Sequence, residues 1–411
     1  MREKICIHFS FLLLFLYVFR FHLFGNKEQL YIVLFVSIVS LLAFSIFFSD
    51  IKKQYIFVTP YNYGFLILLI YMTGSLFYLK YTFMMFSGVS LILVYVVILI
   101  LVEYIAHQNL FWRMYRSYSF GVLFTCLFVS ILHNLVSIEI IENRFGWFEY
   151  QGEVISDPNY FAVFIGLSLF YFCFTHKIRS IAQNIVILLL LSYFFLNTLS
   201  RGVVLAFLIT SLLTYLLKEK NKPRILFYSL AGMLCVPIIY LIYSKFGSEN
   251  ATGLNYQSFN RFFLRDSSDR LDVWSAIYNG FSNSDRFTLF FGNGFQSGSS
   301  IGAKYYLGLE PTLTQLTFKN PHNMFLQFLV ELGIVGTLIL SLIFFFFFIR
   351  TFLQIQKGNY VPLSLLIFFV IVNTSLNVMG FRELFFIYGI LLLSSIRLTK
   401  GLDRTEREVV L

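Results

Sequence analysis

The chain has 411 residues, of which 58% are hydrophobic and only 13% are charged, and its mean hydropathy is +0.76. Soluble domains carry about a quarter charged residues, so this composition excludes an ordinary soluble protein and predicts an integral membrane protein. The net charge of +10 does not indicate nucleic-acid binding, because the basic residues are sorted between connections in the way that orients membrane helices.

Apolar stretches of membrane-spanning length recur along the chain. A spanning helix needs roughly 20 predominantly apolar residues, because every backbone polar group must be bonded within the segment. We therefore predict an all-α, polytopic membrane protein with about twelve transmembrane helices and few strands. The predicted spans are residues 5–24, 30–48, 62–79, 83–105, 119–138, 158–176, 181–198, 202–217, 224–243, 323–349, 361–379 and 383–398.

The connections between these spans alternate in charge. Most lysines and arginines fall on one side, which the positive-inside rule assigns to the cytoplasm together with both termini. The short connections on the opposite side hold only Arg20, Lys27, Lys80, Arg144, Arg201 and Arg382. The opening MREKICIHFSFLLLF is interpreted as a retained first helix, because its apolar run is long and no small-residue cleavage site follows. The four cysteines show no CxxC spacing and are expected to pack in the membrane.

One connection is much longer than the others. Residues 244–321 form a predicted external loop between a first helical part, residues 1–243, and a last part, residues 322–411, which ends in a cytoplasmic tail. The stretch SSDRLDVWSAIYNGF in this loop predicts an amphipathic helix, because its apolar residues recur at helical spacing.

Two further external stretches have recognisable patterns. FGNGFQSGSSIGAKYY lacks the preceding strand and following helix of a dinucleotide-binding unit, so we expect a mobile lid over a site. Residues 139–157 form a smaller excursion, and Asp157 followed by Pro158 is typical of a helix cap and first helical turn.

Arg201 lies in the short connection NTLSRG between two predicted spans. The start of a helix favours anions through its free N–H groups and its dipole, and a guanidinium binds phosphate bidentately. The position therefore predicts a phosphate site facing a water-filled cavity. The alternative is an interfacial arginine that extends its side chain to water.

Arg270 and His322 border the same predicted external face. Trp274 lies one helical turn after Arg270, as a structural partner or as a sugar-stacking aromatic beside a phosphate ligand. His322 stands at the start of a predicted span, where the positive helix end favours a neutral imidazole that can accept a proton. The alternative is a capping or interfacial histidine. Glu331, nine residues on, falls on nearly the opposite helix face and is not paired with His322.

Three short motifs in this order resemble a known family. SRG at residues 200–202, DRLDVW at 269–274 ahead of FGNGF, and PHN at 321–323 followed by ELGIVG resemble the O-antigen polymerase and O-antigen ligase family of bacterial membrane glycosyltransferases. The resemblance covers residues 157–349. It implies a multi-pass enzyme of the bacterial cytoplasmic membrane that uses undecaprenyl-diphosphate-linked oligosaccharides, with no nucleotide sugar, cofactor, metal or nucleic acid.

The resemblance also implies roles for individual residues. Arg201 and Arg270 are expected to bind the diphosphate and His322 to act on the acceptor hydroxyl, with inversion at the anomeric carbon. The neighbouring Ser200, Trp274 and Asn323 are expected to contact substrate.

The acceptor is open between two choices. A second lipid-linked glycan would make the protein a polymerase of O-antigen or capsule, which the Phe-rich composition favours, and a partner could then regulate chain length. A lipid core would make it a ligase. A flippase or transporter is a weaker alternative, because the predicted spans are nearly uncharged and no internal repeat is found.

Overall fold

The computed structural model describes residues 60–79, 85–107, 110–135, 139–141, 144–146, 148–150, 153–154, 157–174, 181–218, 268–308, 321–355, 358–376 and 382–397. The predicted spans at 5–24, 30–48 and 224–243 lie outside these residues, as do residues 244–267 and 309–320 of the predicted loop.

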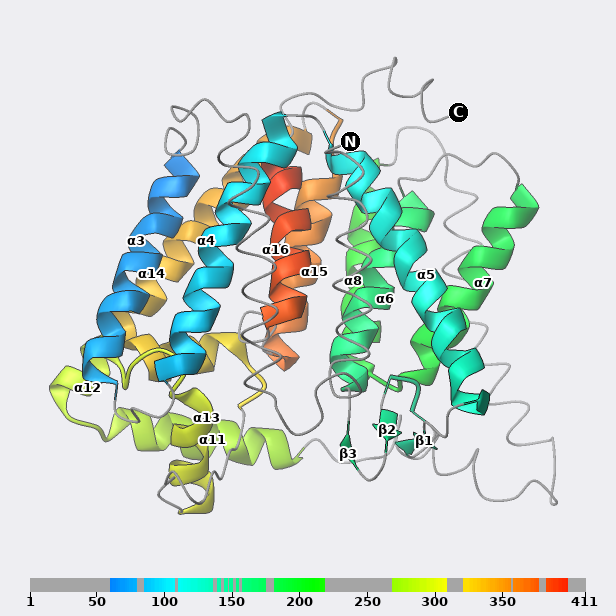
Figure 1. Ribbon diagram of the computed structural model, residues 1–411. Helices are drawn as coiled ribbons and strands as arrows, with labels where there is room; N and C mark the ends of the chain where they lie inside the picture. The colour runs from blue at the N-terminus through cyan, green and yellow to red at the C-terminus, as the bar shows by residue number, and fades with distance from the viewer. Residues whose placement is uncertain are drawn as a thin grey trace.

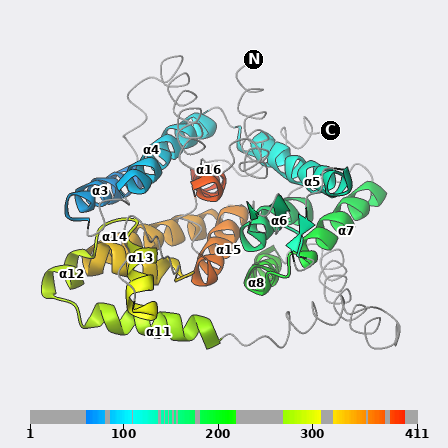
Figure 2. The ribbon, with the colours of Figure 1, turned by 60° about the horizontal axis from the view of Figure 1, so that its bottom comes forward.

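Most of the described chain is helical, as predicted. The long helices run beside one another, whereas α11, α12 and α13 lie across one end of the bundle (Figures 1 and 2). In chain order the helices are α3 (Pro60–Ser75) with the 3₁₀ turn η1 (Leu76–Tyr78), α4 (Met85–His107), α5 (Phe111–Leu135), α6 (Pro158–Phe174), α7 (Ile181–Asn197), α8 (Arg201–Lys218), α11 (Ser268–Ser282), α12 (Arg286–Phe291), α13 (Gly298–Gly302) with the π-helical turn η4 (Ala303–Leu307), α14 (Met324–Ile355), α15 (Val361–Ser375) and α16 (Arg382–Arg397).

Three of the described helices, α4, α5 and α14, are long and apolar enough to cross a membrane. Shorter apolar helices occur at Tyr63–Tyr78, Pro158–Phe174, Ala182–Asn197, Arg201–Leu217 and Val361–Thr374. These helices and the composition identify a membrane protein. The total of twelve spans stays a prediction.

A small antiparallel sheet occupies the predicted excursion between α5 and α6. Its strands are β1 (Glu139–Ile140), β2 (Phe148–Tyr150) and β3 (Glu153–Val154), in the order β1-β2-β3, with Ile140 opposite Phe148 and Tyr150 opposite Glu153. The sheet lies at the end of the bundle that also carries α11 to α13 (Figure 1).

Helix α5 begins at Phe111, eight residues before the predicted span. The prediction excluded this first part because it contains Arg113 and Arg116. Arg116 is accommodated because its guanidinium carbon lies 5.9 Å from the centre of the Phe120 ring, one helical turn further on. Two arginines in the first turns therefore do not prevent the helix from starting there.

Helix α14 is interrupted at Gly333, whose backbone has φ 65° and ψ −169°. The interruption leaves the carbonyls of residues 330 to 332 without their usual helical N–H donors. The segment after α12 supplies replacements: the backbone and side-chain N–H groups of Asn293 bond the Val330 carbonyl, each at 3.0 Å, and Gly294 N bonds the Glu331 carbonyl at 2.9 Å. The carbonyl of Leu332 accepts a hydrogen bond from the Tyr71 hydroxyl at 2.9 Å.

The FGNGF segment is therefore a buried wedge against α14, and the expectation of a mobile lid is wrong for residues 292–298. Gly292 to Phe295 are all buried, and Phe295 N donates to the Ser75 hydroxyl at 3.0 Å. The physical reason is that a broken helix in an apolar surrounding must have its freed carbonyls bonded, and this segment has the glycines that permit close approach.

Gly333→Ala is expected to displace this wedge and lower the midpoint of thermal denaturation. A methyl group there would collide with the Phe290 carbonyl oxygen in addition to sitting at positive φ. The matched control is Gly308→Ala, because Gly308 has φ 67° but open space around it. We expect the control to lose about 1 kcal/mol and Gly333→Ala clearly more. Equal midpoints for the two variants would contradict the wedge.

Candidate functional site

The turn between α7 and α8 presents Arg201 at the end of the bundle that carries the sheet. Leu199 in this turn has φ 52°, a left-handed conformation that a branched side chain seldom adopts. The turn is held by Phe145, whose N–H donates to the Asn197 carbonyl at 2.8 Å. Strained backbone persists where its surroundings determine it, and such positions concentrate at functional sites.

Arg144, which lies between β1 and β2 in the sequence, fixes the same turn. Its side chain is buried, its Nε donates to the Thr198 carbonyl at 3.1 Å, and its Nη2 donates to Asn159 Oδ1 at 3.3 Å. The N–H of Asn159 in turn donates to Asp157 Oδ1 at 2.7 Å. This cation therefore joins the start of α6 to the turn between α7 and α8.

Asp157 precedes α6 as the sequence predicts. Its carboxylate accepts the Asn159 N–H, its carbonyl accepts Phe161 N at 3.0 Å, and Pro158 is the first helical residue. The predicted cap and first turn are confirmed.

Arg201 and Arg270 interact electrostatically. Arg201 is the first residue of α8, with an exposed side chain, and Arg270 lies in the first turn of α11. Although the outer part of Arg270 is exposed, partial desolvation lowers the pKa of its guanidinium, and the positive charge of Arg201 lowers it further. Asp157 and Tyr160 partly offset this effect on the pKa. The charge of Arg201 therefore acts on Arg270, which is distant in sequence. That both arginines bind one substrate group stays a prediction.

The arrangement favours an anion. A cation at the start of a helix is unfavourable by a few tenths of a kcal/mol to about 1 kcal/mol, because the helix dipole is positive there. A second guanidinium nearby adds repulsion, and Arg270 is more readily desolvated when its charge is matched. A phosphate or diphosphate group would relieve both unfavourable terms and accept hydrogen bonds from both guanidinium groups.

Trp274 connects this pair to the PHN segment. Its indole Nε1 donates to the Pro321 carbonyl at 2.6 Å, one residue before His322. Arg270 and Trp274 are separated by about one helical turn, roughly 6 Å of rise along α11. Helix α11 therefore carries Arg270 in its first turn and, one turn later, the tryptophan that bonds the peptide group between Pro321 and His322.

His322 is held in a left-handed conformation, with φ 50°, two residues before α14 begins. Asn323 Oδ1 accepts Leu326 N at 3.1 Å, and the Asn323 carbonyl accepts Gln327 N at 2.9 Å, so Asn323 caps the helix. His322 is partly exposed, at the positive end of α14. Its proposed function as a proton acceptor stays a prediction.

The three residues expected to contact substrate have structural bonds. Ser200 is buried, its carbonyl accepts Val204 N, and its N–H donates to Thr198 Oγ1 at 3.4 Å. The indole N–H of Trp274 bonds the Pro321 carbonyl, and the side-chain oxygen of Asn323 bonds Leu326 N. These bonds give each residue a positioning function, and their contacts with substrate stay predictions.

Replacing Trp274 by phenylalanine separates the two interpretations of this residue. Phenylalanine keeps an aromatic face but cannot donate to the Pro321 carbonyl. If the hydrogen bond positions His322, turnover should fall by roughly tenfold, the equivalent of one hydrogen bond, with little change in KM. Full turnover in Trp274→Phe would indicate that the aromatic face alone matters. Tyr278→Phe, an exposed position on the same helix, is the matched control.

Glu331 is separate from this site, as predicted from its helix face. Its Oε1 accepts hydrogen bonds from Gln327 Nε2 at 2.7 Å and from Gly298 N at 3.0 Å. The carboxylate therefore ties α13 to α14 near the interruption at Gly333.

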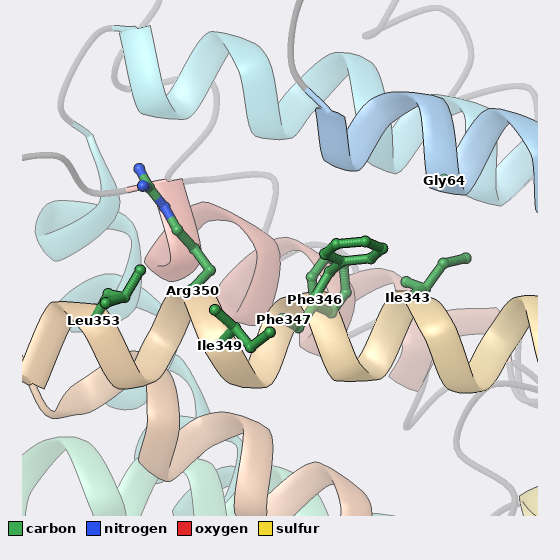
Figure 3. Close-up of a pocket in the computed structure, with 7 residues that line it drawn as sticks. All are labelled: Gly64, Ile343, Phe346, Phe347, Ile349, Arg350 and Leu353. Carbon is green, nitrogen blue, oxygen red and sulfur yellow. The ribbon is translucent and has the colours of Figure 1, made fainter.

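An apolar groove between α3 and α14 lies far from the polar residues. Side chains of α14 face Gly64 of α3 across it (Figure 3), and Ile343 lies roughly 30 Å along α14 from Met324. The groove is lined by Gly64, Ile343, Phe346, Phe347, Ile349, Arg350 and Leu353. Apart from Arg350 its lining is apolar, and its place along α14 separates it from the start of that helix, so it is not part of the arginine site.

Arg144 and Asp157 contribute more than the sequence predicts. The sequence predicts Arg144 only as one of a few external cations and Asp157 only as a helix cap. The bond of Arg144 to the α7–α8 turn and the charge of Asp157 acting on Arg270 depend on how the sheet and this turn pack, and neither has a strong sequence signal.

Comparisons with known proteins find similarity in the part of the chain that contains the candidate site. Residues 186–341 match the family model described as O-antigen ligase, a range that includes Arg201, Arg270 and His322. The chain is also 26% identical over 248 residues to the ComP-specific O-oligosaccharyltransferase of Acinetobacter baylyi. That alignment covers 57% of this chain and 42% of the relative, so it spans less than half of the relative's length. The family resemblance predicted from the three motifs is confirmed.

Proposed function

We propose that this chain, whose residues 186–341 match the family model described as O-antigen ligase, transfers a glycan from a lipid diphosphate to an acceptor hydroxyl at the outer face of the membrane. The observation that supports the proposal is the electrostatic pair formed by Arg201 at the start of α8 and Arg270 in the first turn of α11. Its two positive charges, with Asp157 as the neighbouring carboxylate, suit a multiply charged anion.

The donor is an undecaprenyl-diphosphate-linked oligosaccharide. The acceptor oxygen attacks the anomeric carbon, the bond from that carbon to the diphosphate oxygen breaks, and its electron pair leaves with the diphosphate. Arg201 and Arg270 stabilise this departing charge, and His322 takes the hydroxyl proton. Attack opposite the leaving group inverts the anomeric carbon. The arginines stabilise the leaving-group charge and His322 accepts the proton, so the proposal includes neither metal nor cofactor.

Polymerisation of repeat units is the proposed reaction, with a second lipid-linked glycan as acceptor. The sequence contains 53 phenylalanines, a composition that resembles repeat-unit polymerases. Ligation to a lipid core is the alternative that the family description favours. The name of the Acinetobacter relative supports transfer of a whole oligosaccharide to an oxygen atom, and a chain-length regulator is an additional proposed partner of the polymerase.

Incubation of the purified protein with one defined lipid-linked repeat unit tests the proposal. A polymerase yields a ladder of glycans on a gel without any other acceptor. A ligase yields no ladder but a single product when lipid core is added. No product with either acceptor would contradict glycan transfer.

The same incubation separates transfer from transport. A flippase moves its lipid-linked substrate between leaflets and forms no glycosidic bond. Product formed in detergent micelles, which have no compartments, therefore excludes a protein that only transports. Unchanged substrate in detergent, together with leaflet exchange in vesicles, would favour the transporter.

A further inference from the structure

Helix α12 exposes large aromatic side chains outside the long helices. Phe77 of η1 is 89% exposed, Phe287 54%, Phe290 50% and Phe291 39%. We call these four residues the α12 aromatic patch. Singly exposed apolar residues are ordinary, but a contiguous cluster of this kind marks an interaction surface.

The α12 aromatic patch is built on fixed backbone. The Tyr78 hydroxyl donates to the Phe291 carbonyl at 2.8 Å, and the Tyr78 ring meets Phe287 edge-on at 5.3 Å. Asp285 caps α12 by accepting Thr288 N at 3.0 Å, and these hydrogen bonds lower the pKa of its exposed carboxyl. The phenylalanines are therefore held on the outside by bonds that a frayed segment would not make.

The position of the patch identifies its partner. In both views α12 lies at the outer edge of the bundle beside the end of α3 (Figures 1 and 2). The patch adjoins α14, which α12 contacts and on which Ile334 and Leu338 are exposed, and the hydrogen bond from Tyr78 to Phe291 ties it to η1 at the end of α3. Aromatic residues at the ends of spanning helices are typical of the boundary between lipid headgroups and acyl chains.

We propose that the α12 aromatic patch is seated among the phospholipids of the leaflet on the site side of the membrane. The phenylalanines enter the acyl boundary, and the exposed Asp285 and Arg286 at the start of α12 face the polar headgroups. The proposal requires a membrane-embedded chain but does not depend on glycan transfer.

Lipid seating would fix the depth of the candidate site. Helix α12 continues directly into Gly292 to Phe295, the wedge that completes the interruption of α14. The segment of α14 before Gly333 begins next to His322. A leaflet that holds α12 therefore sets the height of His322 relative to the lipid phosphates.

Spin labelling tests the seating directly. The natural cysteines are replaced by alanine, Phe290→Cys carries a nitroxide, and the full chain is reconstituted into phosphatidylcholine and phosphatidylglycerol vesicles. Asp272→Cys is the matched control, because Asp272 is also exposed and helical but lies on α11. We expect the ratio of oxygen to nickel-chelate accessibility to be several-fold higher at Phe290 than at Asp272.

Three results would overturn the proposal. Equal ratios at the two positions would place the patch in water. A label at Phe290 that neither oxygen nor the nickel chelate reaches would show that the patch is buried inside protein. Dipolar broadening of the label's spectrum would show that the patch lies against a second copy of the chain.

A second measurement keeps the natural cysteines in case their replacement prevents folding. Benzoylphenylalanine in place of Phe290 should form lipid adducts on irradiation, and absence of lipid adducts in the folded protein would also overturn the proposal. Neither readout uses activity, so failure of the seating and failure of glycan transfer are distinguishable.

Discussion

Replacement of His322 by alanine is expected to slow glycan transfer at least about a hundredfold, because a positioned general base contributes that much or more. The loss should appear in kcat with a smaller change in KM, since the proton is removed only as the new bond forms. The measurement is the initial rate with one defined lipid-linked repeat unit. Binding of the donor, followed separately, should survive because the arginine pair is intact.

Alanine alone does not isolate the base, because His322 has a left-handed backbone. Alanine at φ 50° is strained, so part of its effect could come from a shifted Pro321 carbonyl. Asparagine tolerates this conformation and forms hydrogen bonds, but it cannot accept the proton. We expect His322→Asn to fold normally and to lose nearly as much turnover as His322→Ala. Substantial turnover in the asparagine variant would end the assignment of His322 as base.

Helices with uninterrupted apolar sequence could be predicted closely. The predicted span 181–198 corresponds to α7 (Ile181–Asn197), and 202–217 corresponds to α8 (Arg201–Lys218). The SSDRLDVWSAIYNGF pattern corresponds to α11 (Ser268–Ser282), with Ile277 and Phe281 buried as its spacing requires. In each case a local rule of composition or periodicity determines the element.

The interruption of α14 could not be predicted from hydropathy. Residues on both sides of Gly333 are apolar, so a 3.6-residue pattern continues through the break. The break is stable only because Asn293, Gly294 and Tyr71 replace the missing hydrogen bonds, and these residues are distant in sequence. The same tertiary bonds turn FGNGF from an apparent flexible loop into a wedge.

Part of the candidate site could be predicted from the sequence, because local patterns mark some of its residues. Arg201 is marked as a cation that follows an apolar run at a helix start, and Trp274 is marked by its spacing of one helical turn from Arg270. The bond from Trp274 to Pro321 and the contribution of Arg144 depend on how α11 and the sheet pack. Contacts of that kind have no local signature.

Arg201→Lys is expected to reduce transfer by roughly ten- to a hundredfold, the loss equivalent to one charged hydrogen bond. Lysine keeps the charge at the start of α8 but replaces the planar fork with a single ammonium. The loss should come with weaker inhibition by added undecaprenyl diphosphate, a readout that does not require turnover. Arg113→Lys, in α5, is the matched control for an exposed arginine far from the site in sequence.

The double variant of Arg201 and Arg270 decides whether both guanidinium groups act on one anion. Groups that contact the same ligand are not independent, so the combined loss should be smaller than the product of the two single losses. Replacement of Arg201 by neutral glutamine would also remove the charge repulsion that lowers the pKa of Arg270, whereas Arg201→Lys keeps that repulsion. Strictly multiplicative losses would mean that the arginines serve separate ligands.

Full activity in Arg201→Lys would show that positive charge, without bidentate geometry, is sufficient at the start of α8.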